Sequence, residues 1–353
     1  MLDVHPDITQ ARTPDAALYR DPALFERQVR LLRRAWHLPP AGLGAEPGSV
    51  LPFALLPGVL DAPLVLTRDE HGEVRCLSNV CTHRASLVAE EAGCPGALRC
   101  RYHGRRFSLT GRFLSMPEFE EAQDFPSSDD DLASVAVGQL GPVTFTSLEP
   151  VAPFDALVAP VRERLAFAPW ERLVFTDCRE YVVAAHWALY LENYLEGFHI
   201  PFVHPGLNQV LDYATYRTEA FANGNVQIAL ATDDTFFHLP PGHPDAGQRI
   251  GAYYFFLFPA ILVNVYPWGV SLNAILPEAI DRTRIRFESW VWDASLRQSG
   301  AGAALHAVEM EDEAVVESVA RGVRSPLYRR GRYSPTREVG VHHFHRMLSA
   351  ALE

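Results

Sequence analysis

The chain has 353 residues, of which 48% are hydrophobic, and 31 basic against 43 acidic residues give it a net charge of -12. This composition supplies enough apolar side chains for two or three folded units and excludes a disordered chain. The acidic balance argues against a nucleic-acid partner, because phosphate binding requires clustered positive charge.

Cysteine usage and hydropathy indicate a cytoplasmic protein that does not enter a membrane. Residues 1–10 contain no Arg or Lys and no apolar run, so we expect no secretory signal there. Five cysteines, an odd number, argue for a reducing compartment and against a set of disulfides. The uncharged stretch 250–277 is long enough to span a bilayer. Its prolines, asparagines, aromatic and β-branched residues instead favour buried strands joined by turns.

The first half of the chain divides into two predicted regions. Apolar residues at helical spacing over residues 14–36 predict a helical N-terminal segment, residues 1–45, which we expect to pack on the last domain. In residues 46–148, short apolar runs alternate with turns rich in Gly, Pro and Asp. That alternation is typical of a small antiparallel β unit.

The remainder, residues 149–353, begins with a proline-rich linker. Strand-like runs then alternate with helical stretches, which predicts an α+β domain. The predicted strand runs are 172–176, 181–185, 253–258, 261–265 and 284–292. Two of the predicted helices contain candidate functional residues, and they cover about residues 186–199 and 305–322.

Two pairs of metal-binding residues lie in the predicted β unit. Cys81 and His83 form a Cys-x-His pair, and Cys100 and His103 form a Cys-x-x-His pair after sixteen intervening residues. Each pair can present a thiolate and an imidazole on one turn. Two thiolates on one iron and two imidazoles on the other make a Rieske [2Fe-2S] cluster. Structural zinc is the alternative, although zinc sites usually pair Cys with Cys at short spacing.

The segments 81–85 and 100–104 resemble the Rieske signature of ring-hydroxylating oxygenases. This resemblance implies that the two cysteines bind one iron and the two histidines the other. High-potential Rieske proteins of respiratory complexes have an extra cysteine in each cluster loop, and the two form a disulfide. Here only Cys94 lies between the pairs, so the resemblance is to the lower-potential oxygenase type. We expect Cys76, Cys94 and Cys178 to be packed thiols.

A second group of candidate ligands follows in residues 187–204. The segment 187–199 has helical spacing, so Glu196 and His199, three residues apart, are predicted to share one helix face. Two prolines then end the helix and allow His204 to approach the same point. Two histidines and a carboxylate with open positions beside them are how non-haem Fe(II) oxygenases bind O2 next to substrate.

The stretch from Asn193 to His204 resembles the N-x-x-D/E-x-x-H-x4-H element of Rieske oxygenase catalytic domains. The resemblance implies that His199 and His204 bind a mononuclear Fe(II). Glu196 would not be a ligand; it would bridge by hydrogen bonds between a cluster histidine of a neighbouring subunit and an iron histidine. Many members have Asp at this position. In having Glu at this position, the chain resembles the branch that acts on quaternary ammonium compounds such as choline, betaine and carnitine.

The third iron ligand must come from later in the chain. The acidic run 309–313 lies early in the predicted helix 305–322 and resembles the family's carboxylate segment, in which Asp312 matches best and Glu311 is the substitute. A solvated acidic face is the alternative interpretation. Three further histidines lie at positions 342, 343 and 345, and we expect them to be structural.

The resemblance covers nearly the whole chain and implies an all-β Rieske domain with a helix-grip, START-like catalytic domain built on an antiparallel sheet. It implies a terminal oxygenase that uses O2 and a small-molecule substrate, takes electrons from an NAD(P)H-dependent reductase or ferredoxin, and forms a homotrimer. We expect mono-oxygenation or N-demethylation. An aromatic ring-hydroxylating dioxygenase and a non-enzymatic Rieske electron carrier are the alternatives.

A run of aromatic residues follows the iron-site motif. An aromatic cage could hold a quaternary ammonium by cation-π attraction, although aromatic residues in strands more often belong to the core. The candidates are Tyr253, Tyr254, Phe255, Phe256, Phe258, Tyr266 and Trp268.

Overall fold

The computed structural model describes residues 3–303 and 305–353. It contains two compact units: Arg33–Phe154, here called the β unit, and Met1–Leu32 with Asp155–Glu353, here called the catalytic unit. Both sheets and helices occur, and the strand pairs are antiparallel, so the α+β prediction is confirmed. Within the described residues, none of the helices has the length and hydropathy that crossing a bilayer requires.

The β unit consists of two antiparallel sheets. The larger has the strand order β1-β2-β3-β7-β8 and the smaller the order β4-β5-β6. Cys81 and Cys100 belong to the apolar core of this unit, so packing fixes their positions. The strands are β1 (Val50–Leu55), β2 (Ala62–Arg68), β3 (Val74–Ser78), β4 (Leu98–Arg99), β5 (Arg106–Phe107), β6 (Phe113–Ser115), β7 (Ser134–Leu140) and β8 (Val143–Ser147).

A seven-stranded antiparallel sheet with the order β10-β11-β12-β13-β14-β15-β9 forms the centre of the catalytic unit. The strands are β9 (Val174–Val183), β10 (Arg217–Phe221), β11 (Gly224–Leu230), β12 (Ile250–Leu257), β13 (Ile261–Tyr266), β14 (Gly269–Ala279) and β15 (Arg282–Val291). The uncharged stretch 250–277 therefore forms strands β12, β13 and most of β14, as predicted. Residues on both faces of β13 are buried, which explains its continuous apolar sequence.

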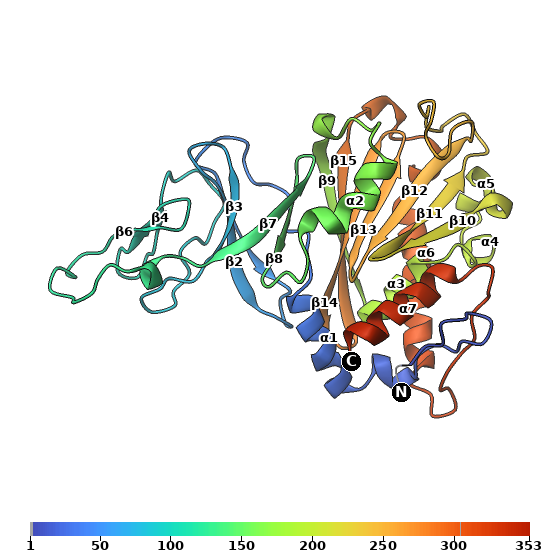
Figure 1. Ribbon diagram of the computed structural model, residues 1–353, viewed down its shortest axis with the longest axis horizontal. Coiled ribbons are helices and arrows are strands. Elements are labelled where there is room, and N and C mark those ends of the chain that lie inside the picture. The colour runs from blue at the N-terminus through green and yellow to red at the C-terminus, as the bar shows by residue number, and fades with distance from the viewer. Residues whose placement is uncertain (1–2, 304) are drawn as a thin grey trace. The chain divides into compact units, whose positions relative to one another are not determined.

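Helices of the catalytic unit pack against this sheet (Figure 1). Helix α3 contacts β14, α6 contacts β9, and α7 lies along β10 and β11. The predicted helix 305–322 is confirmed as α6. The helices are α1 (Pro22–Arg33), α2 (Phe154–Arg164), α3 (Trp187–Tyr194), α4 (Ile200–Val203), α5 (Leu207–Val210), α6 (Leu305–Gly322) and α7 (Val339–Ala351).

The predicted helix over residues 186–199 is wrong at its C-terminal end. Helix α3 ends at Tyr194, and a turn separates it from α4. The Glu196 carboxylate accepts hydrogen bonds from the backbone N–H groups of Phe198 and His199, so it competes with continuation of the helix. Pro201 does not end a helix either, because it lies in the first turn of α4, where its missing N–H costs nothing.

A close helix contact supports the segment that follows α3. A Cβ atom at Gly340, in the first turn of α7, would lie 2.3 Å from the carbonyl oxygen of Leu195. Only glycine therefore allows α7 to approach the end of α3 this closely. Leu195 directly precedes Glu196, so this contact helps to fix where the functional turn begins.

Candidate active site

Two loops in the β unit have matching backbone hydrogen bonds. In each loop the cysteine N–H, of Cys81 or Cys100, donates to the carbonyl five residues later at 2.8 Å. The residue four positions after each cysteine donates back to the cysteine carbonyl, Ala85 at 3.0 Å and Gly104 at 3.1 Å. Both of these residues have positive φ angles, 56° and 76°, which turn each loop back on itself.

The four predicted cluster ligands lie together on these loops. The Cys81 and Cys100 thiols are within hydrogen-bonding reach of each other, and the Nδ1 atoms of His83 and His103 are 3.2 Å apart. Burial raises the pKa of Cys100, but hydrogen bonds, first from the Tyr102 backbone N–H, outweigh it and lower the pKa below its ordinary value. A pair of neighbouring thiols and a pair of neighbouring Nδ1 atoms fit the ligand set of a Rieske cluster.

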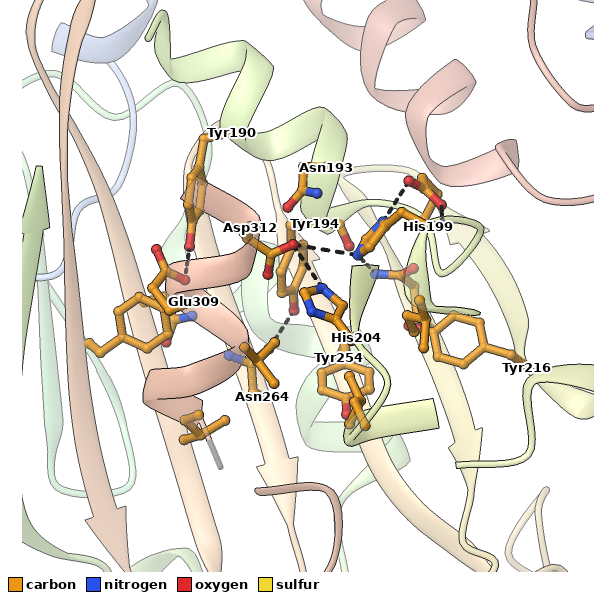
Figure 2. Close-up of a pocket in the computed structure, with 18 of the residues that line it drawn as sticks. Tyr190, Asn193, Tyr194, His199, His204, Tyr216, Tyr254, Asn264, Glu309 and Asp312 are labelled. Carbon is orange, nitrogen blue, oxygen red and sulfur yellow. Dashed lines mark hydrogen bonds and ion pairs between the residues drawn. The ribbon is translucent and has the colours of Figure 1, made fainter. Parts of the chain in front are cut away.

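Three donor atoms converge at the second site (Figure 2). The carboxylate Oδ1 of Asp312 lies 2.9 Å from His204 Nε2 and 3.5 Å from His199 Nε2. All three donors lie within 4.8 Å of one another. The short helix α4 sets the spacing of the histidines, because His199 precedes its first residue and His204 follows its last. Two imidazoles and one carboxylate facing a cavity fit the facial triad of non-haem Fe(II).

Each of these histidines has a second carboxylate at its other ring nitrogen. Glu196 Oε1 lies 2.7 Å from His199 Nδ1, and Glu311 Oε2 lies 2.7 Å from His204 Nδ1. A carboxylate that accepts Nδ1–H orients the ring and leaves Nε2 free to bind a metal. Burial lowers the pKa of His204, but the bonds to Asp312 and then Glu311 outweigh it and raise the pKa. Glu311, the predicted substitute ligand, therefore contacts the opposite side of the ring from Asp312.

This difference predicts unequal effects of two neighbouring substitutions. Asp312→Asn is expected to lose the mononuclear iron, because a neutral amide is a much weaker metal ligand than the carboxylate it replaces. Glu311→Gln is expected to retain the iron with an affinity reduced about tenfold, which is typical for an outer partner of a metal ligand. Anaerobic Fe(II) titration against a competing chelator measures both affinities. Equal losses in the two variants would contradict the assignment of Asp312 as the ligand.

A cavity of about 100 Å³ adjoins the three donors, and aromatic rings and side-chain amides line it. Of the seven aromatic residues proposed for a cage, Tyr254 and Tyr266 line this cavity. Tyr253 and Phe255 flank Tyr254 in β12 and therefore point to the opposite face of the sheet. Gln227, Tyr254 and Asn264 stand directly opposite one another on three consecutive strands. The amides and rings therefore share one face.

Sequence reasoning missed other residues of the cavity wall. Tyr190 and Tyr194, four residues apart in α3, line it, and the Tyr194 hydroxyl donates to Asn264 Oδ1 at 2.6 Å. Glu309 of α6 also lines it, one helical turn before Asp312. Burial raises the pKa of Glu309 to about 8 despite a hydrogen bond from the Tyr190 hydroxyl. The i, i+4 spacing of the tyrosines and the i, i+3 spacing of the carboxylates were the available signals.

The remaining cysteines and histidines lie outside both sites. The expectation of a packed thiol is confirmed for Cys76 but wrong for Cys94 and Cys178, which are exposed in a loop and on the edge strand β9. All five cysteines are free. The C-terminal histidines have protein partners, as a structural role requires: His342 Nε2 with His5 O at 2.8 Å, His343 Nε2 with Phe221 O at 2.8 Å, and His345 Nδ1 with Tyr333 Oη at 2.7 Å.

The family model described as ring hydroxylating alpha subunit (catalytic domain) matches residues 170–353. The chain belongs to the ring-hydroxylating alpha subunit family. The model described as Rieske [2Fe-2S] domain matches residues 56–126, which include both Cys/His loops. This ring-hydroxylating alpha subunit is thus a Rieske-type oxygenase, an oxidoreductase, with a catalytic domain that binds mononuclear iron in the family.

Similar proteins cover most of this alpha subunit. It is 28% identical to choline monooxygenase, chloroplastic, of Beta vulgaris over 97% of this chain and 78% of that protein. It is 24% identical to the carnitine monooxygenase oxygenase subunit of Escherichia coli K12 over 82% of this chain and 81% of that protein. Its fold is similar to that of the quaternary ammonium Rieske monooxygenase CntA, with a TM-score of 0.83, 20% identity, and coverage of 99% of this chain and 97% of that chain.

Proposed function

We propose that this Rieske oxygenase inserts one oxygen atom into a C–H bond of a small quaternary-ammonium compound. The observation that carries the proposal is Glu196, a glutamate rather than an aspartate, in contact with His199 Nδ1 at 2.7 Å. In having glutamate at this position, the chain resembles the branch of the family that acts on such compounds. The curated relatives named for choline and carnitine support the same substrate class.

We assign the metal ligands from the donor sets of the two sites. When bound, the cluster supplies single electrons and the mononuclear iron activates O2. Glu311 positions His204 and does not bind metal. The proposed ligands are Cys81 and Cys100 on one cluster iron, His83 and His103 on the other, and His199, His204 and Asp312 on the mononuclear iron.

The cavity residues would hold the substrate beside these donors. Tyr254 and Tyr266 provide apolar walls that exclude water, while the amide of Asn264 is held by the Tyr194 hydroxyl. The second oxygen atom of O2 leaves as water, and its reduction to water consumes two electrons and two protons. If an N-methyl carbon is hydroxylated, its C–N bond breaks and releases formaldehyde, a tertiary amine and a proton.

We further propose how electrons reach the site. A reductase or ferredoxin partner delivers electrons to the cluster, as in the family. Glu196 then bridges by hydrogen bonds between a cluster histidine of a neighbouring subunit and His199, in a head-to-tail homotrimer. The contact between Glu196 Oε1 and His199 Nδ1 supports the second half of this bridge.

We also propose domain boundaries and a location for the protein. We propose residues 46–148 as the cluster domain and residues 149–353 as the catalytic domain, with residues 1–45 packed on the latter. The grouping of Met1–Leu32 with the catalytic unit supports the packing of the first segment. The free cysteines support a reducing, cytoplasmic location.

A single turnover of chemically reduced, iron-loaded enzyme with O2 tests the reaction without a native reductase. We expect oxygenated product or formaldehyde from choline, a betaine or carnitine, detected by mass spectrometry with ¹⁸O2. Simple aromatic acids serve as the comparison substrates. A doubly hydroxylated ring, with both oxygen atoms from O2, would instead identify a ring-hydroxylating dioxygenase and overturn the proposal.

A further inference from the structure

The cavity beside the iron ligands contains a carboxylate that the proposed chemistry does not use. Only 3% of Glu309 is exposed, and one of its oxygens accepts a hydrogen bond from the Tyr190 hydroxyl at 2.7 Å. The other oxygen, Oε1, is buried without a hydrogen-bond partner among the described residues. Glu309 is not part of the donor group formed by His199, His204 and Asp312.

A buried carboxylate with an unsatisfied oxygen is costly unless something compensates its charge. The residues that line the cavity include no Arg, and the chain contains no Lys, so no cationic side chain of the cavity wall can do so. The two lining histidines already contact Glu196, Glu311 and Asp312. Burial therefore favours the protonated form of Glu309 at neutral pH, consistent with its pKa of about 8, and the cavity wall offers its ionised form no Arg or Lys partner.

The rest of the wall suits a cation that cannot donate hydrogen bonds. Tyr254 and Tyr266 line the cavity with their ring centroids 5.9 Å apart in an edge arrangement, and Tyr190 and Phe287 add further rings. Aromatic faces attract a cation through the ring quadrupole, and the attraction is larger where water is excluded. A quaternary ammonium fits both the rings and an unpartnered carboxylate oxygen, because it needs compensation of charge and not a hydrogen-bond acceptor.

We propose that Glu309 is the counter-ion for the quaternary ammonium group of the substrate and thereby selects cations over neutral molecules of the same shape. This inference rests on the proposed function and adds a residue to it. The Tyr190 hydroxyl orients the carboxylate through Oε2, and the charge on Oε1 is left without a partner among the described residues. A nearby positive charge in turn favours the ionised form of Glu309. In this arrangement Glu309 is a specificity-determining residue that acts on the substrate and not on a metal.

The test compares cations with isosteres in which carbon replaces the nitrogen, so that shape is kept and charge is lost. Choline, glycine betaine and carnitine are each paired with the corresponding tert-butyl compound, and binding to anaerobic, iron-loaded enzyme is measured by calorimetry. We expect the wild type to prefer at least one cation over its isostere by about tenfold or more. Glu309→Gln should weaken binding of that cation by about ten- to hundredfold, because a charge-assisted contact is lost, and leave the isostere unchanged.

Glu313→Gln is the matched control. Glu313 lies one turn further along α6, also has a buried oxygen without a partner, and does not line the cavity. Its variant should keep the wild-type preference, and Glu309→Asp should restore part of it. The cluster spectrum and the iron content of each variant report folding independently of binding.

The outcomes separate the two proposals. If the wild type prefers the cation and Glu309→Gln keeps that preference, the role of Glu309 is wrong while the substrate class stands. If the wild type shows no preference for any cation, the substrate class is wrong and the role of Glu309 falls with it.

Discussion

Replacing His199 by alanine is expected to abolish product formation while the [2Fe-2S] cluster remains. His199 supplies one of three donor atoms that lie within 4.8 Å of one another. Without its imidazole, that group keeps only the donors of His204 and Asp312. Loss of an outer partner of a metal ligand already lowers metal affinity or activity by about 10- to 100-fold. We therefore expect loss of the ligand itself to lower activity by more than about 100-fold. The cluster loops belong to the other compact unit, and their core should be unaffected.

Iron content and absorbance distinguish the two metal sites in this variant. The wild type should contain about three irons per chain and His199→Ala about two, with the cluster spectrum and its reduction by dithionite unchanged. His343→Ala is the control, because His343 contacts the Phe221 carbonyl and lies outside both sites. Product formation by His199→Ala at the wild-type rate would refute the iron site. A wild type with only two irons would favour the electron carrier.

The second large effect is expected for Glu196→Gln, which should slow re-oxidation of the cluster by more than about tenfold while the mononuclear iron stays bound. The substitution keeps the size of the side chain but removes the negative charge that His199 Nδ1 contacts at 2.7 Å. A neutral amide is a weaker acceptor for the imidazole N–H, and the proposed bridge depends on this contact. His199 Nε2, which faces Asp312, is not directly affected.

Stopped-flow absorbance of the reduced enzyme mixed with O2 and substrate measures this step directly. Glu219→Gln is the control, because Glu219 is an exposed carboxylate on β10 that pairs with Arg164. Wild-type re-oxidation in Glu196→Gln would show that the carboxylate is not on the electron path. A parallel loss of iron would instead assign Glu196 to holding His199 in place.

The sequence predicted the strands of the catalytic sheet best where burial is strongest. β12 and β13 are continuous apolar runs because nearly all of their residues are buried, and both were predicted to within a few residues. The edge strand β9 was predicted as two separate runs, since most of its side chains are exposed and its apolar pattern is weak. Strands β10 and β11 were not predicted, and their register with β12 depends on pairing between segments far apart in the chain.

For the candidate site, local spacing predicted the cysteines and histidines, whereas the roles of the carboxylates depend on packing between distant segments. The Cys/His pairs and the His199/His204 pair are short motifs, so the sequence alone indicated them. The distinction between Asp312 and Glu311 depends on which nitrogen of His204 each carboxylate approaches. That depends on how α6 packs beside α3, which spacing within one segment does not reveal. The same packing pairs Glu309 with Tyr190.

The two-imidazole, one-carboxylate donor set has a consequence for producing the protein. Such a set binds divalent metals in the Irving–Williams order, in which Zn²⁺ and Cu²⁺ exceed Fe²⁺. Metal supply during expression, rather than the ligands, will therefore decide which ion fills the site. A preparation grown in zinc-rich medium will keep the cluster and its colour while the oxygen-activating position holds a redox-inert ion. Colour therefore measures cluster assembly, and specific activity must be normalised to mononuclear iron.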